Sequence, residues 1–378
     1  MVVSTTVMPT LTLSPVSSWL LQIGRFAPPP TLRTFLRSAG RTLQSRRPAP
    51  VAPRIRRRQD AVLAQGGAGP HHQAAILRDV GRGATPTIVL GGFVPDSSQA
   101  VFLLRDLFLR RGDLYCVDYP RHGFHLDLLC AQLDDLVEEL ALRAGQRPVV
   151  LGISFGAGLV LEWLRRRRLA LGSPALRGVV LVSPVACVED LLPDAAVKPT
   201  TLLGRAIKPY LDARAGVDER LVEKSRTIFV KMFEAGAQNR AALKGIMTAA
   251  EVAELRAGVM GTISGIDFTG ACERVQALRR LAPPTSYFQL DVLPLSDAPT
   301  LILYAEKEDA VIAEGSPTRR AFAAGHRAYF PFSECRVVAN PGGAAVQHAS
   351  LVFHSANFRP VFGRFYGQLR NWRVPRAA

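Results

Sequence analysis

The sequence predicts an α/β fold, a mostly parallel sheet with helices on both faces and an inserted helical cap. From about residue 74, short continuous apolar runs alternate with amphipathic segments. Apolar runs without polar alternation are typical of strands that are buried on both faces of a parallel sheet. More than a hundred residues between the runs at 176–185 and 299–306 contain no strong strand. The composition, 48% hydrophobic and 21% charged, is globular.

The strands and helices of this core alternate along the chain. The segment at 126–145 has apolar residues at helical spacing and stops at Gly145, as helices commonly do. The expected strands are 87–92, 114–123 with its closing turn, 148–153, 176–185, 299–306 and 335–340. The expected helices are 97–112, 126–145, 155–169 and a last one at about 350–370.

The region between the fourth and fifth of these apolar runs is expected to be helical. Thr248 followed by Glu251 fits a capping box, in which each residue satisfies a backbone N–H at a helix start. The segment 218–236 also has helical periodicity. Because the sheet resumes afterwards, the sequence predicts an insertion over 187–297 within a core formed by 74–186 and 298–372.

The first 59 residues differ from the rest of the chain. They contain ten arginines and no acidic residue, and their apolar residues follow no fixed period, so we expect a disordered leader over 1–59. An arginine-rich, acid-free and hydroxyl-rich start is similar in composition to an organelle transit peptide. A plain tail on a cytoplasmic protein is the expectation, with organelle targeting as the alternative.

Charge and cysteine content exclude several classes of protein. Of the 47 basic residues, ten lie in the leader, which leaves 37 against 31 acidic residues and only +6 for the rest of the chain. A folded nucleic-acid-binding face is therefore not supported. No apolar run is long enough for a transmembrane segment. Five widely spaced cysteines favour reduced thiols over disulfides or a metal site, so no metal or cofactor is expected, and the oligomeric state stays open.

Ser154 stands between two glycines, in the sequence Gly152-Ile153-Ser154-Phe155-Gly156. This G-x-S-x-G pattern is common by chance, but here it follows a buried strand and opens a helix, which is the context that gives it meaning. Glycines on both sides avoid collisions with the neighbouring strand and helix at a sharp turn. We expect Ser154 to be a nucleophile at the edge of the sheet; a serine helix cap is the alternative.

At this motif the chain resembles the α/β-hydrolase superfamily, over roughly residues 75–370. The family's oxyanion loop usually reads His-Gly-x, and here Gly91-Gly92-Phe93 lacks the histidine. The resemblance implies that the backbone amides of Phe93 and Phe155 hold the oxyanion. It also implies that His122, in a turn similar to the family's D-x-x-G-H-G, is structural.

A serine hydroxyl needs a base, and the resemblance implies His348, which follows the last strand by a loop. His326 and His354 are the alternatives. The acid should follow the penultimate strand, and Asp309 occupies the family's usual offset. Glu306 and Glu308 lie close by, and we expect Asp309 rather than either of them to take the buried position, with both glutamates facing solvent.

These residues predict a serine hydrolase that cleaves a small-molecule carboxylic ester or thioester through an acyl-enzyme. Ser154 would attack, His348 would act as base and then acid, and Asp309 would orient the imidazole. An acyltransferase with the same triad, or a non-catalytic ligand-binding protein of this fold, are the alternatives.

Overall fold

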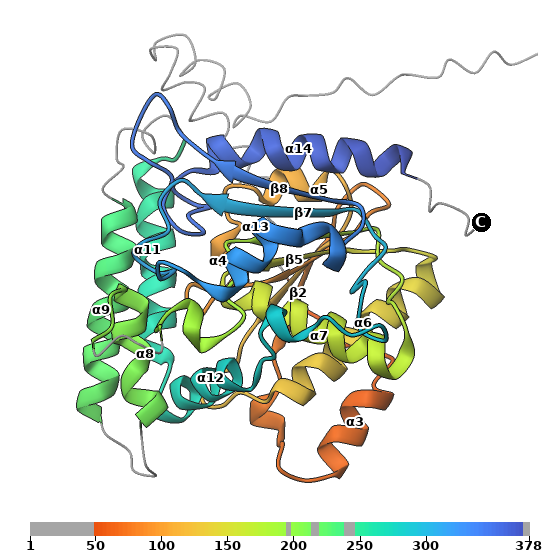
Figure 1. The fold of residues 1–378 in the computed structure, drawn as a ribbon, viewed down its shortest axis with the longest axis horizontal. Helices are drawn as coiled ribbons and strands as arrows, with labels where there is room; N and C mark the ends of the chain where they lie inside the picture. Colours follow the sequence, from red (N-terminus) through yellow and green to blue (C-terminus); the bar gives the residue numbers. More distant parts are fainter. Residues whose placement is uncertain (1–48, 194–197, 213–218, 238–245, 373–378) are drawn as a thin grey trace, which may run out of the picture.

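The computed structural model describes residues 49–193, 198–212, 219–237 and 246–372, and its centre is an eight-stranded sheet (Figure 1). The spatial order is β1-β2-β4-β3-β5-β6-β7-β8. The strands are β1 (Ala49–Pro50), β2 (Ala75–Asp79), β3 (Thr87–Leu90), β4 (Leu114–Asp118), β5 (Val149–Ile153), β6 (Gly178–Val182), β7 (Thr300–Ala305) and β8 (Ser333–Val338). The strands from β3 to β8 are parallel, while β2 is antiparallel to β4 and to β1. This arrangement confirms the predicted fold class.

The central strands are buried on both faces, as their continuous apolar runs predict. In β3, Ile88 and Leu90 belong to one hydrophobic cluster while Val89, between them, belongs to another. Successive side chains of a strand point to opposite faces, so a strand between two helical layers must be apolar at every position.

Helices form the two layers that cover the sheet. One layer consists of α6 (Leu126–Ala144), α7 (Phe155–Leu171) and α13 (Pro317–Tyr329); the other consists of α4 (Ser97–Ala100), α5 (Arg105–Leu109) and α14 (Ser355–Asn371). Gly145 ends α6 in the left-handed conformation with φ of 59°, as the predicted stop requires. Figure 1 shows α14 lying along one side of the sheet and α6 and α7 on the other.

The predicted single helix over 97–112 is wrong, because the chain forms α4 and α5 with a tighter segment between them. Phe102 N–H donates to Gln99 O at 3.2 Å and Leu104 N–H donates to Val101 O at 2.8 Å, which are three-residue spacings. This winding directs Leu103 and Leu104 into two different hydrophobic clusters. Periodicity alone did not reveal that this segment packs in two directions.

The predicted disorder over 1–59 is wrong for residues 49–59. β1 extends the sheet, and α3 (Arg57–Ala64) packs on α6. The backbone N–H of Gln59 donates to the fully buried Asp135 carboxylate at 3.1 Å, and Arg58 pairs with the same carboxylate at 3.3 Å. The arginines near the end of this segment therefore serve as partners of acidic residues in α6, which composition cannot reveal. The remainder of the predicted leader lies outside the described residues.

The segment between β6 and β7 is helical in its described parts. It contains α8 (Leu202–Asp212), α9 (Glu219–Ala237), α11 (Ala249–Gly265) and α12 (Phe268–Arg280). Thr248 caps α11 through the predicted capping box with Glu251. Figure 1 shows α8, α9 and α11 beside the sheet, on the side toward which β7 and β8 point. These helices thus lie over the carboxyl ends of the strands.

Candidate active site

Ser154 lies at a sharp turn between β5 and α7. Its φ of 55° and ψ of −118° are sparsely populated for a residue with a side chain, so the backbone is strained there. Hydrogen bonds stabilise this strained conformation. Ser154 N–H donates to Val182 O at 2.8 Å, and Ser154 O accepts from the amides of Ala157 and Val185 at 2.9 and 3.2 Å. The turn places the hydroxyl at the carboxyl edge of the sheet, where open α/β sheets place their sites.

The glycines that flank Ser154 are required by close backbone approach. A Cβ on Gly156 would lie 2.3 Å from Gly91 O, and one on Gly152 would lie 2.5 Å from the Cα of Ala157. Neither backbone contact can move aside easily. The predicted reason for the two glycines is confirmed.

His348 lies against Ser154, as the sequence predicts. Its Nε2 is 2.8 Å from the Ser154 Oγ, and its side chain is 8% exposed. The loop that carries it is joined to the loop after β7. Lys307 N–H donates to Val346 O at 2.9 Å, and Lys307 forms an isolated parallel β-bridge with Gln347. With the proton on Nδ1, Nε2 accepts the hydrogen bond of the serine hydroxyl.

The carboxylate at Nδ1 of His348 is Glu308, and the predicted contact of Asp309 is wrong. Glu308 Oε2 forms a hydrogen bond with Nδ1, while Asp309 is exposed. Glu308 O accepts from the amides of Val311 and Ile312 at 2.9 and 2.8 Å, so the chain turns at Glu308. This turn buries the Glu308 side chain and leaves the next residue, Asp309, on the surface. The sequence offset alone did not reveal where the turn begins.

Ser183 completes the surroundings of Glu308 and was missed by the sequence reasoning. Its Oγ donates to Glu308 Oε1 at 2.7 Å and accepts from the amide of Ala349 at 3.3 Å. The amide of Ala305 donates to the same Oε1 at 2.6 Å. Ser183 is fully buried and has a φ of 46°, so it is a second strained serine at a strand end. The sequence does contain a signal for Ser183: it is a polar residue directly after the apolar strand β6, whose carboxyl end lies at the same sheet edge as that of β5.

The third nearby carboxylate, Glu306, faces a different group. It is exposed, and its Oε2 accepts from the amides of Asn340 and Val346 at 3.2 and 3.4 Å. Glu306 thus holds the base of the loop that leads to His348. It does not contact the imidazole.

The loop predicted to form the oxyanion hole lies beside Ser154. A Cβ on Gly92 would lie 3.4 Å from the Cβ of Ser154. The rings of Phe93 and Phe155 stack with centroids 4.3 Å apart and an interplanar angle of 10°. Within the described part of the chain, the backbone N–H groups of Phe93 and Phe155 have no hydrogen-bond acceptor.

The other candidate histidines do not contact Ser154 in the described structure. His326 lies 2.7 Å from the Ser333 Oγ, and His354 lies 3.1 Å from the Ser350 Oγ. Burial lowers the pKa of both. His122, predicted to be structural, lies 2.9 Å from Asp267 at the start of α12.

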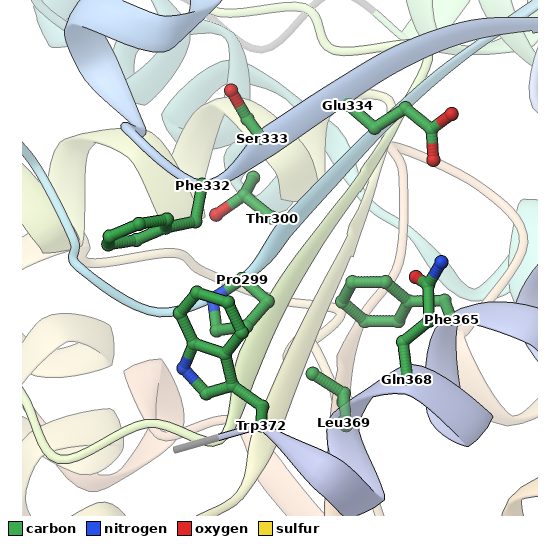
Figure 2. A pocket seen from close by; sticks show the side chains of 9 residues that line it. All are labelled: Pro299, Thr300, Phe332, Ser333, Glu334, Phe365, Gln368, Leu369 and Trp372. Atoms are coloured by element: carbon green, nitrogen blue, oxygen red, sulfur yellow. The ribbon is translucent and has the colours of Figure 1, made fainter. Parts of the chain in front are cut away.

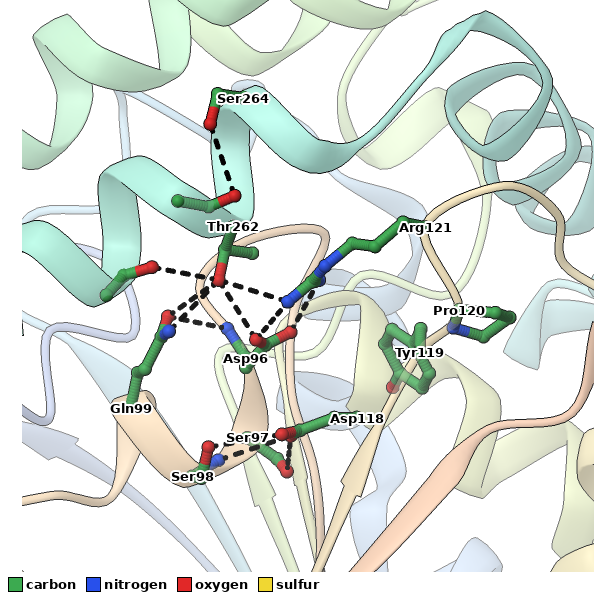
Figure 3. A network of polar contacts seen from close by, with 12 residues as sticks. Asp96, Ser97, Ser98, Gln99, Asp118, Tyr119, Pro120, Arg121, Thr262 and Ser264 are labelled. Atoms are coloured by element: carbon green, nitrogen blue, oxygen red, sulfur yellow. Dashed lines mark hydrogen bonds and ion pairs between the residues drawn. The ribbon is translucent and has the colours of Figure 1, made fainter.

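A polar network joins the helical insertion to the core around Asp96 (Figure 3). Arg121 pairs with both oxygens of Asp96, and the Thr262 hydroxyl of α11 donates to Asp96 at 2.9 Å. Asp118 accepts from the Ser97 hydroxyl at 2.6 Å, and its pKa is raised by burial and by the nearby Asp96. The start of α4 is thus held by Arg121 and Asp118 of the core and by Thr262 of the insertion.

Two cavities of the described structure lie away from Ser154. One, of about 310 Å³, opens at the amino ends of β7 and β8 (Figure 2) and is lined by Pro299, Thr300, Phe332, Ser333, Glu334, Phe365, Gln368, Leu369 and Trp372. The other, of about 380 Å³, lies between α12 and the segment after β6. Neither contains a member of the Ser154, His348 and Glu308 group.

The described residues contain no group of three or more His, Cys, Asp or Glu side chains arranged to hold a metal. Among the same residues, we find no helix with the length and apolarity needed to span a bilayer. All five cysteines are free thiols.

Comparison with known proteins identifies the family. No curated protein matches the sequence. Among solved structures, an esterase from Thermogutta terrifontis is similar with a TM-score of 0.51 and 14% identity, covering 78% of this chain and 94% of that one. A bacterial membrane phospholipase A gives 0.55 and 13%, covering 94% and 97%. An epoxide hydrolase from Bacillus megaterium gives 0.52 and 13%, covering 78% and 97%.

At these identities the structural similarity shows the fold alone, and the names of the three proteins cover different reactions. The family model is more specific. A model described as the alpha/beta hydrolase family matches residues 88–361, which include Gly91-Gly92-Phe93, Ser154, Glu308 and His348. This chain belongs to the alpha/beta hydrolase family.

Proposed function

We propose that the protein is a serine hydrolase that cleaves a carboxylic ester or thioester through an acyl-enzyme. The observation that carries this proposal is the line of contacts from Ser154 Oγ to His348 Nε2 and from His348 Nδ1 to Glu308. Nucleophile, base and orienting carboxylate in this order are what activation of a serine hydroxyl requires.

The reaction follows from these contacts. Ser154 Oγ attacks the acyl carbon while its proton passes to Nε2 of His348, and the carbonyl oxygen becomes an anion held by the backbone amides of Phe93 and Phe155. The imidazolium then gives its proton to the departing alcohol or thiol. Water then gives a proton to His348 and attacks the acyl carbon. The bond from that carbon to Ser154 Oγ breaks, the imidazolium returns its proton to Oγ, and the carboxylic acid leaves.

Glu308 replaces Asp309 as the orienting acid in this proposal. Its carboxylate fixes the imidazole tautomer and stabilises the imidazolium that forms during the reaction. The Ser183 hydroxyl and the amide of Ala305 both donate to Oε1, which leaves Oε2 to contact His348. A serine at the nucleophile position argues against epoxide-opening chemistry, because that chemistry proceeds through a carboxylate nucleophile.

The bulky apolar residues of the helical insertion do not by themselves indicate an acyl-chain length. Phe229 and Phe233 of α9 join a hydrophobic cluster with Leu103 and Phe353, and Ile228 and Met232 also pack on the core. Packing accounts for the apolar character of these residues. A series of p-nitrophenyl esters of increasing chain length measures the preference directly.

The experiment that tests the proposal compares the wild-type chain with Ser154→Ala. We expect the variant to fold, to lose about 10⁶-fold in kcat, and to escape covalent labelling by a fluorophosphonate probe. A folded Ser154→Ala variant that retains most of the esterase activity would contradict the proposal. Wild-type protein that is labelled but turns over esters only with an added alcohol or amine acceptor would identify an acyltransferase, and absence of labelling would indicate a binding protein.

A further inference from the structure

Arg274 is a buried arginine that belongs to the helical insertion but reaches the core. It lies on α12 and is 2% exposed. Its guanidinium donates to Phe93 O at 2.8 Å and to Pro120 O at 2.8 Å, and it lies over the ring of Tyr119 at 5.5 Å from the centroid. Within the described ranges no carboxylate forms an ion pair with it. Its hydrogen-bond partners are backbone carbonyl groups instead.

A buried cation without a carboxylate partner is unfavourable, so its contacts need an explanation. Burial lowers the pKa of Arg274 to about 10, yet the side chain remains charged at neutral pH. Charge-assisted hydrogen bonds are stronger and more directional than neutral ones. Those of Arg274 join two loops at the carboxyl edge of the sheet, one of which carries Phe93.

The oxyanion loop is held at both ends by side chains from outside it. The Tyr119 hydroxyl donates to Gly91 O at 2.8 Å, and Arg274 donates to Phe93 O. Peptide groups are planar, so fixing these two carbonyls leaves few conformations for the backbone between them. The N–H of Phe93 lies within this clamped segment.

We propose that Arg274 is a positioning residue that fixes the Phe93 amide for oxyanion binding, so that α12 is part of the catalytic apparatus. This inference rests on the proposed acyl-enzyme function. Preorganised donors stabilise a transition state because they need no reorientation when charge develops. Losing the clamp releases the donor without removing it, and the damage should therefore fall on the transition state and spare substrate binding.

The test uses Arg274→Met and Arg274→Lys in the full chain. For Arg274→Met we expect kcat to fall roughly 10²-fold with KM within about threefold, since misplacement by about 1 Å has effects of this size. Affinity for a trifluoromethyl ketone, which forms a tetrahedral adduct with the serine, should fall by a similar factor. Lys should restore part of both, because an ammonium still donates to one carbonyl.

Arg226→Met is the matched control. Arg226 also donates to two backbone carbonyls, Ser264 O at 2.9 Å and Ile266 O at 3.0 Å, but these contacts lie within the insertion. We expect this variant to lose stability while keeping kcat and inhibitor affinity. If Arg274→Met behaves in the same way, Arg274 is only structural and the inference is overturned.

If Arg274→Met does not fold, Arg274→Lys and Tyr119→Phe decide the matter. Tyr119→Phe removes only the hydroxyl at Gly91 O and should lower kcat and inhibitor affinity together, by a smaller factor. Unchanged values in both variants would overturn the inference. Its failure is distinguishable from failure of the proposed function, since the latter appears as retained activity in Ser154→Ala.

Discussion

The Glu308 carboxylate contacts Nδ1 of His348 from a loop forty residues earlier in the chain. The contact is protected from solvent, because the two side chains are 2% and 8% exposed. Ser183, at the end of β6, donates to the other oxygen of the same carboxylate. Orientation of the imidazole therefore depends on three segments of the chain.

Glu308 and Asp309 are adjacent and should differ sharply when each is neutralised. We expect Glu308→Gln to lower kcat by roughly 10⁴-fold, the effect of removing the orienting acid from a catalytic triad. Asp309→Asn should stay within about threefold, since an exposed carboxylate contributes little. Steady-state hydrolysis of one p-nitrophenyl ester measures both. The reverse order of effects would show that Asp309 is the acid in solution.

Gly156→Ala and Gly363→Ala should change the free energy of unfolding in opposite directions. A methyl group on Gly156 would overlap Gly91 O and Leu90 O at 2.3 and 2.4 Å, so β3 and α7 must separate. We expect loss of activity and a large fall in the free energy of unfolding. Gly363, within α14, has open space around the added Cβ, and alanine there should stabilise the helix by about 0.5–1 kcal/mol. Urea unfolding of both variants is the measurement, and equal midpoints would contradict the expectation.

Deleting residues 1–59 should destabilise the protein. The deletion removes β1 and the donors from Arg58 and Gln59 to the buried Asp135 carboxylate. A buried acceptor that loses its partners costs about 1–3 kcal/mol, which corresponds to several degrees in Tm. A chain that begins at residue 49 retains these contacts and is the control. Equal melting temperatures for the two truncated chains would refute this role of the segment.

His354 should contribute to loss of stability in acid. Burial lowers the pKa of its imidazole, while a hydrogen bond with the backbone of Ala344 and the nearby Glu306 act in the opposite direction. The unfolded chain therefore binds the proton more readily, and the contribution is fully present above the ordinary histidine pKa of about 6.5 and is lost as pH falls below it. Between about pH 7.5 and pH 5, the free energy of unfolding should fall less in His354→Gln than in the wild-type protein. Parallel pH profiles would contradict this prediction.

Local patterns predicted the elements that dominate the fold and two members of the candidate triad. Ser154 was accessible because a strand, a glycine-flanked serine and a helix are contiguous in the sequence. Glu308 was not, because which of three neighbouring carboxylates is buried depends on where the chain turns after β7. Arg274 and Ser183 were missed since their partners lie far away in the chain, at Phe93 and Glu308. Contacts of this kind are set by tertiary packing.

The order of the strands has a consequence for how activity arises during folding. Ser154, Ser183, Glu308 and His348 follow β5, β6, β7 and β8, which are neighbours in the sheet in that order. A chain that has paired its strands only as far as β7 has the proposed nucleophile and acid but lacks the proposed base. Recovery of esterase activity during refolding should therefore report the docking of β8 and its loop, and it should lag behind the return of the circular dichroism signal from the earlier elements.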